Sequence, residues 1–166
     1  RIDTGTGWFD PRWEVELAQR LAAFGELSAG DRDGIEALAR EVEQLSFVSA
    51  VAPPQVLWPD GLRIEVDLRH PVACVRTSSE TFLTVAEDGM VLSGEWRVPP
   101  GSADGFLPRV VLGAGASSRL RPGTVLDGHA ARDGLSVAVS LQEHLRPADR
   151  ARLARVAIGG RTARFT

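Results

Sequence analysis

The stretch EQLSFVSAVAPPQVLWPDGLRIEVDLRHPVACV (43–75) decides the fold, because its pattern changes there from helix to strand. FVSAVA (47–52) predicts a short strand that ends at a Pro-Pro pair, and WPDG (58–61) predicts a turn. In LRIEVDLR (62–69) apolar and charged residues alternate, which is typical of an antiparallel strand with one buried face. The buried face of these strands needs a covering layer.

Two amphipathic helices upstream are the expected cover. The first is predicted to begin at Asp10-Pro11 and to end at Gly25, and its apolar stripe consists of Trp13, Leu17, Leu21 and Phe24. The second follows Asp31, and its apolar residues recur at intervals of three, four and three: Ile35, Leu38, Val42 and Leu45. Together they form a helical hairpin.

Beyond residue 70 the pattern is mostly strand and turn. PVACVR (71–76), TFLTVA (81–86) and MVLSG (90–94) predict strands, the last two joined by a tight hairpin at Asp88-Gly89. Residues 97–128 are rich in Pro, Gly and Ser and are expected to be an irregular connection.

Helix is expected again over ARDGLSVAVSLQEHL (131–145), whose apolar side carries Ala131, Leu135, Ala138, Leu141 and Leu145. A short helix near Pro147, a strand at VAI (156–158) and a Gly159-Gly160 turn into RTARFT (161–166) complete the chain. The fold class is therefore α+β.

Charge divides the chain at the same place as the pattern. Residues 1–72 carry 7 Arg and 13 acidic residues, whereas residues 73–166 carry 12 Arg and 9 acidic residues. With the change of composition near Pro71, this predicts two domains, residues 1–71 and residues 72–166.

The composition argues against several classes of function. The formal charge of the 166 residues is −3, which argues against an electrostatic nucleic-acid binder. All 19 basic residues are Arg, so there is no lysine for a Schiff base or a phosphate-binding loop. The single cysteine, Cys74, lies in an apolar run and is expected to be a buried small residue. No stretch reaches the roughly 18 apolar residues of a membrane span.

The segment VVLGAGASSRLRPGT (110–124) resembles the glycine-rich loop of nucleotidyltransferases. The lysine that such a loop needs is absent, and Arg121-Pro122-Gly123 interrupts any helix behind it, so a flexible surface loop is favoured. Glu80, Glu87 and Asp88 fall in predicted turns, and the histidines have no metal-site spacing. No convergent set of reactive groups is visible, and we predict no catalytic, metal or cofactor site.

Residues 43–75, followed by FLTVAEDGMVL (82–92), resemble the extracytoplasmic region of the bacterial cell-division family FtsQ/DivIB. The resemblance rests on a helix ending in leucine, a V-x-x-A-x-V-like strand, a W-P turn, an alternating strand and the phrase P-V-A. In this chain it is carried by Leu45, Val48, Val51, Trp58, Pro59, Leu62, Ile64, Val66, Pro71, Val72 and Ala73.

The resemblance implies a POTRA-like helix–helix–strand–strand module followed by a β-rich domain with C-terminal helices. It implies a non-enzymatic scaffold without a cofactor, held at the outer (periplasmic) face of the cytoplasmic membrane by a transmembrane helix absent from this sequence. The implied partners are FtsB- and FtsL-like divisome proteins, bound in part by pairing of the last strand. A POTRA-type module of a secretion or envelope-assembly system, and a nucleotide-binding enzyme that uses residues 110–124, are the alternatives.

The terminal strand is the main candidate for partner binding, since an edge strand offers unpaired backbone groups to a second chain. Its candidate contact residues are Arg161, Ala163, Arg164 and Phe165. Trp58 and Pro59, in the turn of the first domain, are a second candidate surface.

Overall fold

The protein is mixed α+β in a computed structural model that describes residues 10–57, 61–102, 105–112, 119–144, 156–159 and 162–165. It divides into two compact units, Arg1–Arg69 and His70–Thr166, here called the N-terminal and C-terminal units. The predicted junction between residues 71 and 72 falls inside a strand of the C-terminal unit.

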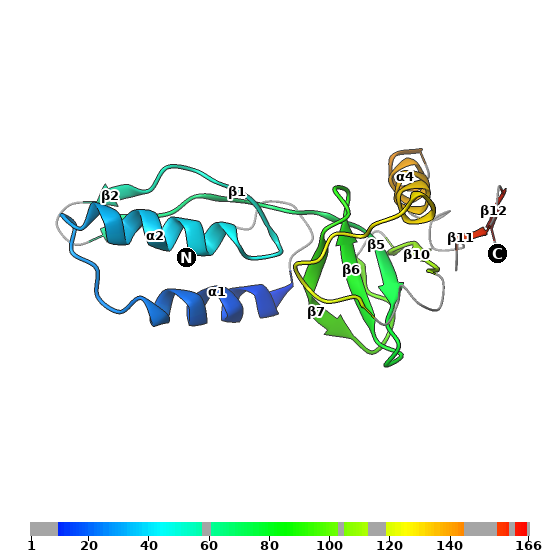
Figure 1. The fold of residues 1–166 in the computed structure, drawn as a ribbon, viewed down its shortest axis with the longest axis horizontal. Coiled ribbons are helices and arrows are strands. Elements are labelled where there is room, and N and C mark those ends of the chain that lie inside the picture. Colours follow the sequence, from blue (N-terminus) through cyan, green and yellow to red (C-terminus); the bar gives the residue numbers. More distant parts are fainter. Residues whose placement is uncertain are drawn as a thin grey trace. The chain divides into compact units, whose positions relative to one another are not determined.

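The two helices of the N-terminal unit begin and end at the predicted signals. Helix α1 (Pro11–Ala23) is capped by Asp10, whose carboxylate accepts a hydrogen bond from the Arg12 backbone N–H at 3.0 Å. Gly25 follows it with a φ of +67°, a conformation that favours glycine. Helix α2 (Arg32–Glu43) is capped by Asp31, which accepts from the Gly34 N–H at 2.9 Å. The two helices lie side by side (Figure 1).

The apolar stripe of α2 is buried as predicted, and that of α1 is buried only in part. Ile35, Leu38 and Val42 of α2 are all buried. In α1 only Trp13 is buried, stacked on Phe47 with 4.9 Å between the ring centroids, while Leu21 remains 39% exposed. Leu17 and Phe24 are half-buried, so Trp13 is the one fully buried residue of this predicted stripe.

Strands of the N-terminal unit form two antiparallel pairs. Strand β1 (Val48–Val51) pairs with β4 (Val66–Leu68), and β2 (Gln55–Leu57) pairs with β3 (Gly61–Arg63). The single strand predicted over residues 62–69 is therefore broken at residues 64 and 65. The ribbon stays continuous there because the Ala52 N–H donates to the Glu65 carbonyl at 2.9 Å. Helix α2 packs on β1.

The C-terminal unit is built on a six-stranded sheet. Three consecutive antiparallel strands at one side of it are the predicted ones: β5 (Pro71–Arg76), β6 (Phe82–Ala86) and β7 (Val91–Trp96). The sheet order is β12-β11-β10-β5-β6-β7, in which β10 (Arg109–Val110) runs parallel to both β5 and β11 (Val156–Gly159). The outermost strand, β12 (Thr162–Phe165), is antiparallel to β11. Strands β8 (Gly101–Ser102) and β9 (Gly105–Phe106) form a separate pair.

Helix α4 (His129–His144) covers one face of this sheet (Figure 1). Leu135 and Ala138 of α4 belong to one buried cluster with Val75, Val85 and Val110 of the sheet. A second cluster contains Cys74, Phe82 and Leu107, packed by the partly buried Trp96. Burying both faces explains why the strand residues 82–86 are apolar or small at every position.

Residues 97–128 are more ordered than predicted. They contain β10, whose Val110 is buried in the sheet. Residues 123–126 are bound to β7: the Val91 N–H donates to the Thr124 carbonyl at 2.8 Å, and the Gly123 N–H donates to the Val91 carbonyl at 2.8 Å. The favoured prediction of a flexible surface loop over residues 110–124 is therefore wrong at Val110, whereas residues 121–124 are exposed. The short helix predicted near Pro147 lies outside the described residues.

Candidate partner-binding surfaces

Strand β12 is an outer strand of the six-stranded sheet, so one of its edges faces no described strand. Ala163, Arg164 and Phe165 lie in it, and Arg161 lies outside the described residues. In the pairing with β11, Ala163 faces Ile158, and Phe165 faces Val156. The sheet therefore places three of the predicted contact residues together on an edge strand.

The register of β12 indicates which of its backbone groups are free. Gly159 pairs with Thr162 across a connection of two residues, and such a connection closes on a hydrogen-bonded pair. Because hydrogen-bonded and non-hydrogen-bonded pairs alternate, Thr162 and Arg164 are expected to bond to β11. The N–H and C=O groups of Ala163 and Phe165 are then directed to the outer edge.

The opposite edge of the sheet is formed by β7, and the start of this strand is covered. Residues 123–126 run along the start of β7, where the Leu126 N–H also donates to the Gly89 carbonyl at 2.8 Å. Met90 and Val125 form an isolated antiparallel bridge there. The start of β7 is thus closed by the chain's own backbone, which leaves β12 as the more open edge among the described strands.

The second predicted surface cannot be placed, since Trp58 and Pro59 lie outside the described residues. The neighbouring Val56 and Leu57 of β2 are 45% and 44% exposed. These two apolar side chains were not singled out by the sequence pattern. Because successive strand residues point to opposite faces, each face of β2 carries one exposed apolar side chain.

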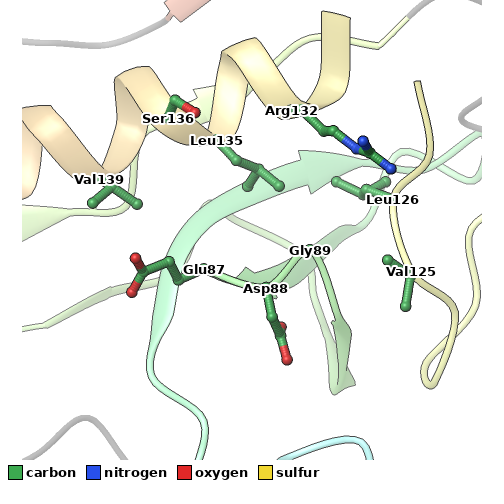
Figure 2. Close-up of a pocket in the computed structure, with 9 residues that line it drawn as sticks. All are labelled: Glu87, Asp88, Gly89, Val125, Leu126, Arg132, Leu135, Ser136 and Val139. Atoms are coloured by element: carbon green, nitrogen blue, oxygen red, sulfur yellow. The ribbon is translucent and has the colours of Figure 1, made fainter. Parts of the chain in front are cut away.

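A concave site lies between α4 and the β6–β7 hairpin; we call it the α4 pocket (Figure 2). Its volume is about 530 Å³. Leu135 points from α4 toward the hairpin, and Glu87 and Asp88 lie on the hairpin side (Figure 2). The lining residues are Glu87, Asp88, Gly89, Val125, Leu126, Arg132, Leu135, Ser136 and Val139.

The α4 pocket has an apolar centre and a charged rim. Leu126 and Leu135 are buried, whereas Arg132 is exposed and lies 3.8 Å from the Asp127 carboxylate. Among the described lining residues there is no histidine or cysteine, and the ionisable side chains are Glu87, Asp88 and Arg132. The buried leucines at the centre of the pocket suit docking of an apolar side chain. Sequence reasoning missed this site, although the Asp88-Gly89 turn that forms one wall was predicted.

The side chain of Cys74 is fully buried, as expected, and its thiol donates a weak hydrogen bond to the Leu107 carbonyl at 3.7 Å. Burial raises the pKa of Cys74 to about 12, an effect opposed by the charge of Arg109. A thiol with such a pKa is a poor nucleophile at neutral pH. Among the described residues, no three His, Cys, Asp or Glu side chains gather as metal ligands would.

None of the described helices has the length and apolar character needed to cross a bilayer. No family model matches the chain, and no curated protein matches it either.

Proposed function

We propose that this chain is the extracytoplasmic part of a membrane-anchored, non-enzymatic scaffold of bacterial cell division similar to the FtsQ/DivIB family. In this role it binds FtsB- and FtsL-like proteins outside the cytoplasmic membrane. Binding occurs by addition of a partner strand to β12.

The observation that carries the proposal is the position of β12 at the end of the six-stranded sheet. An edge strand presents a row of N–H and C=O groups, and a second chain satisfies them without any change in the sheet. The start of β7, at the other edge, is closed by residues 123–126. This asymmetry favours one docking edge over two, which suits a scaffold that must not polymerise.

The N-terminal unit gives further support. Two adjacent helices followed by short antiparallel strands, with α2 packed on β1, have the element order expected of a POTRA-like module. The same order is expected of a POTRA module in a secretion or envelope-assembly system, whose partner would be a translocated chain. That second function remains the main competitor.

Binding to purified partners tests the proposal. The chain is co-expressed with the extracytoplasmic parts of the FtsB- and FtsL-like proteins of its source organism, and complexes are sought by size-exclusion chromatography and calorimetry. We expect a stable 1:1:1 or 1:1 complex. Absence of binding to both proteins, together with binding to unfolded envelope proteins, would favour the secretion module. Saturable micromolar binding of a nucleotide, detected by tryptophan fluorescence, would favour the enzyme.

A further inference from the structure

A second cavity lies where β5 ends and β10 begins, at the loop that joins β5 to β6. Its volume is about 310 Å³, and two of its lining residues are arginines. The full lining is Arg76, Thr77, Ser78, Glu80, Arg109, Val110, Val111 and Leu112. We call it the Arg76–Arg109 pocket.

Strand register brings the two arginines together. Arg109 of β10 pairs with Cys74 of β5, and Arg76 follows Cys74 by two residues on the same strand. Residues two apart on a strand share a face of the sheet, so the side chains of Arg76 and Arg109 leave the same face. Val75 and Val110 leave the other face, into the cluster that α4 covers.

The two guanidinium groups differ in their partners. Arg76 is paired with the Glu80 carboxylate at 2.8 Å, and both side chains are largely exposed. The Nε of Arg109 is buried and has no hydrogen-bond partner among the described residues. A buried donor left without an acceptor is costly, and a guanidinium is best satisfied by an oxyanion. The lining therefore carries two positive charges against one negative charge.

The loop that supplies Glu80 is held in an unusual conformation. Glu80 has a φ of +66°, which is rare for a residue other than glycine. The loop is closed by a hydrogen bond from the Thr77 N–H to the Thr81 carbonyl at 2.8 Å, and the Thr77 and Thr81 hydroxyls lie 2.7 Å apart. Strain of this kind gathers at functional positions. Here it places a carboxylate on Arg76, whereas no ion pair joins Arg109 to a carboxylate of the described residues.

We propose that the Arg76–Arg109 pocket binds a carboxylate group, which pairs with Arg109 and competes with Glu80 for Arg76. The carboxylate comes either from an acidic side chain of a protein partner or from a small carboxylic acid. The first source rests on the proposed function, whereas the pocket itself does not. The two oxygens of a carboxylate group match the planar fork of donors on a guanidinium.

The direct test observes the arginine Nε–H signals of the ¹⁵N-labelled chain by NMR during titration with glutarate at constant ionic strength. We expect a saturable shift at Arg109 in the millimolar range. Arg12 is the internal control, because its Nε already donates to both carboxylate oxygens of Asp10 at 2.9 Å and should not respond. An equal response at Arg12, or none at Arg109, would overturn the site. Tighter binding of inorganic phosphate than of glutarate would overturn the assignment to a carboxylate.

Two variants are expected to change glutarate binding in opposite directions. Arg109→Gln should abolish the saturable response. Glu80→Gln, at an exposed position, should tighten glutarate binding about threefold to tenfold, because the internal competitor loses its charge. Unchanged or weaker binding by Glu80→Gln would contradict the competition, even if Arg109→Gln fails to fold.

Binding to the protein partner distinguishes the two possible sources of the carboxylate. If an acidic side chain of the FtsB- or FtsL-like protein occupies the pocket, Arg109→Gln should weaken that complex about tenfold. Glutarate binding with an unchanged protein complex would support the pocket and refute the protein source. If no divisome partner binds at all, the proposed function fails, while the glutarate titration still decides the pocket.

Discussion

Replacing Trp13 by alanine should remove most of what holds α1 to the N-terminal unit. Trp13 is fully buried and stacked on Phe47, with an interplanar angle of 7°. A buried tryptophan covers about 150–250 Å², and at about 25 cal/mol per Å² this gives an upper bound of about 4–6 kcal/mol. Large-to-small substitutions of buried aromatics cost about 3–5 kcal/mol, which is the loss we expect in the free energy of unfolding.

The matched control is Leu21→Ala on the same helix. Leu21 belongs to the predicted apolar stripe but is 39% exposed, and alanine is at least as good a helix former as leucine. We expect this change to cost at most about 1 kcal/mol. Urea unfolding followed by far-ultraviolet circular dichroism measures both. A loss from Leu21→Ala as large as that from Trp13→Ala would refute the view that α1 is held by one aromatic contact.

Three further predictions concern local features. Asp10→Ala removes both the cap of α1 and the ion pair to Arg12, and it should lower the free energy of unfolding in urea by about 1–2 kcal/mol. Asp10→Asn keeps the cap and should lower it less. Equal losses from the two variants would contradict the role of the charge. Gly25→Ala should cost about 1–2 kcal/mol because its φ is +67°, and Gly30→Ala, at a glycine without positive φ, should stay within about 0.5 kcal/mol. The pKa of Cys74 rises from 9.0 to about 12 on folding, so its neutral form stabilises the fold fully below pH 9. Between pH 9 and 12 the unfolded chain binds fewer protons than the folded chain. The free energy of unfolding should therefore fall with pH by about 1.4 kcal/mol per pH unit more than that of Cys74→Ala. Parallel pH profiles of the two proteins would contradict this.

Local signals predicted much of the fold. The α2 stripe, the start of α1 at Asp10-Pro11, and the β6–β7 hairpin at Asp88-Gly89 each depend on residues close in sequence, and all are found. Helical period shows which residues share a face, but it does not show how much of that face is covered. For that reason the periodicity of α1 did not show that Leu21 is exposed and that Leu17 and Phe24 are only half-buried.

Features that depend on distant pairing were missed. Strand β10 has two residues, too few for any period, and it becomes a strand only through parallel pairing with β5 and β11. The division of the predicted strand 62–69 into β3 and β4, at residues 64 and 65, likewise follows from β2 and β1 being separate partners.

The candidate sites show the same division. The Gly159-Gly160 turn and the alternation after it predicted β12, but only the sheet order makes it an outer strand. The α4 pocket draws its lining from the β6–β7 hairpin, residues 125 and 126, and α4. Arg76 and Arg109 are 33 residues apart in the sequence and meet only through the β5–β10 register.

The proposed function depends on the backbone N–H and C=O groups at the outer edge of β12. Proline substitutions distinguish residues whose N–H faces a partner strand from residues whose N–H bonds to β11. At Ala163, whose N–H is expected to face outward, proline removes a donor that only a partner strand uses; at Arg164 it removes one used by β11. Ala163→Pro should therefore abolish partner binding in a chain that still folds, whereas Arg164→Pro should disrupt the β11–β12 hairpin.

Amide hydrogen exchange of β12, with and without the bound FtsB-like protein, tests this most directly. We expect the Thr162 and Arg164 amides to be protected in the free chain, and the Ala163 and Phe165 amides to slow at least about tenfold on binding. Partner binding that leaves exchange at Ala163 and Phe165 unchanged would contradict strand addition at this edge.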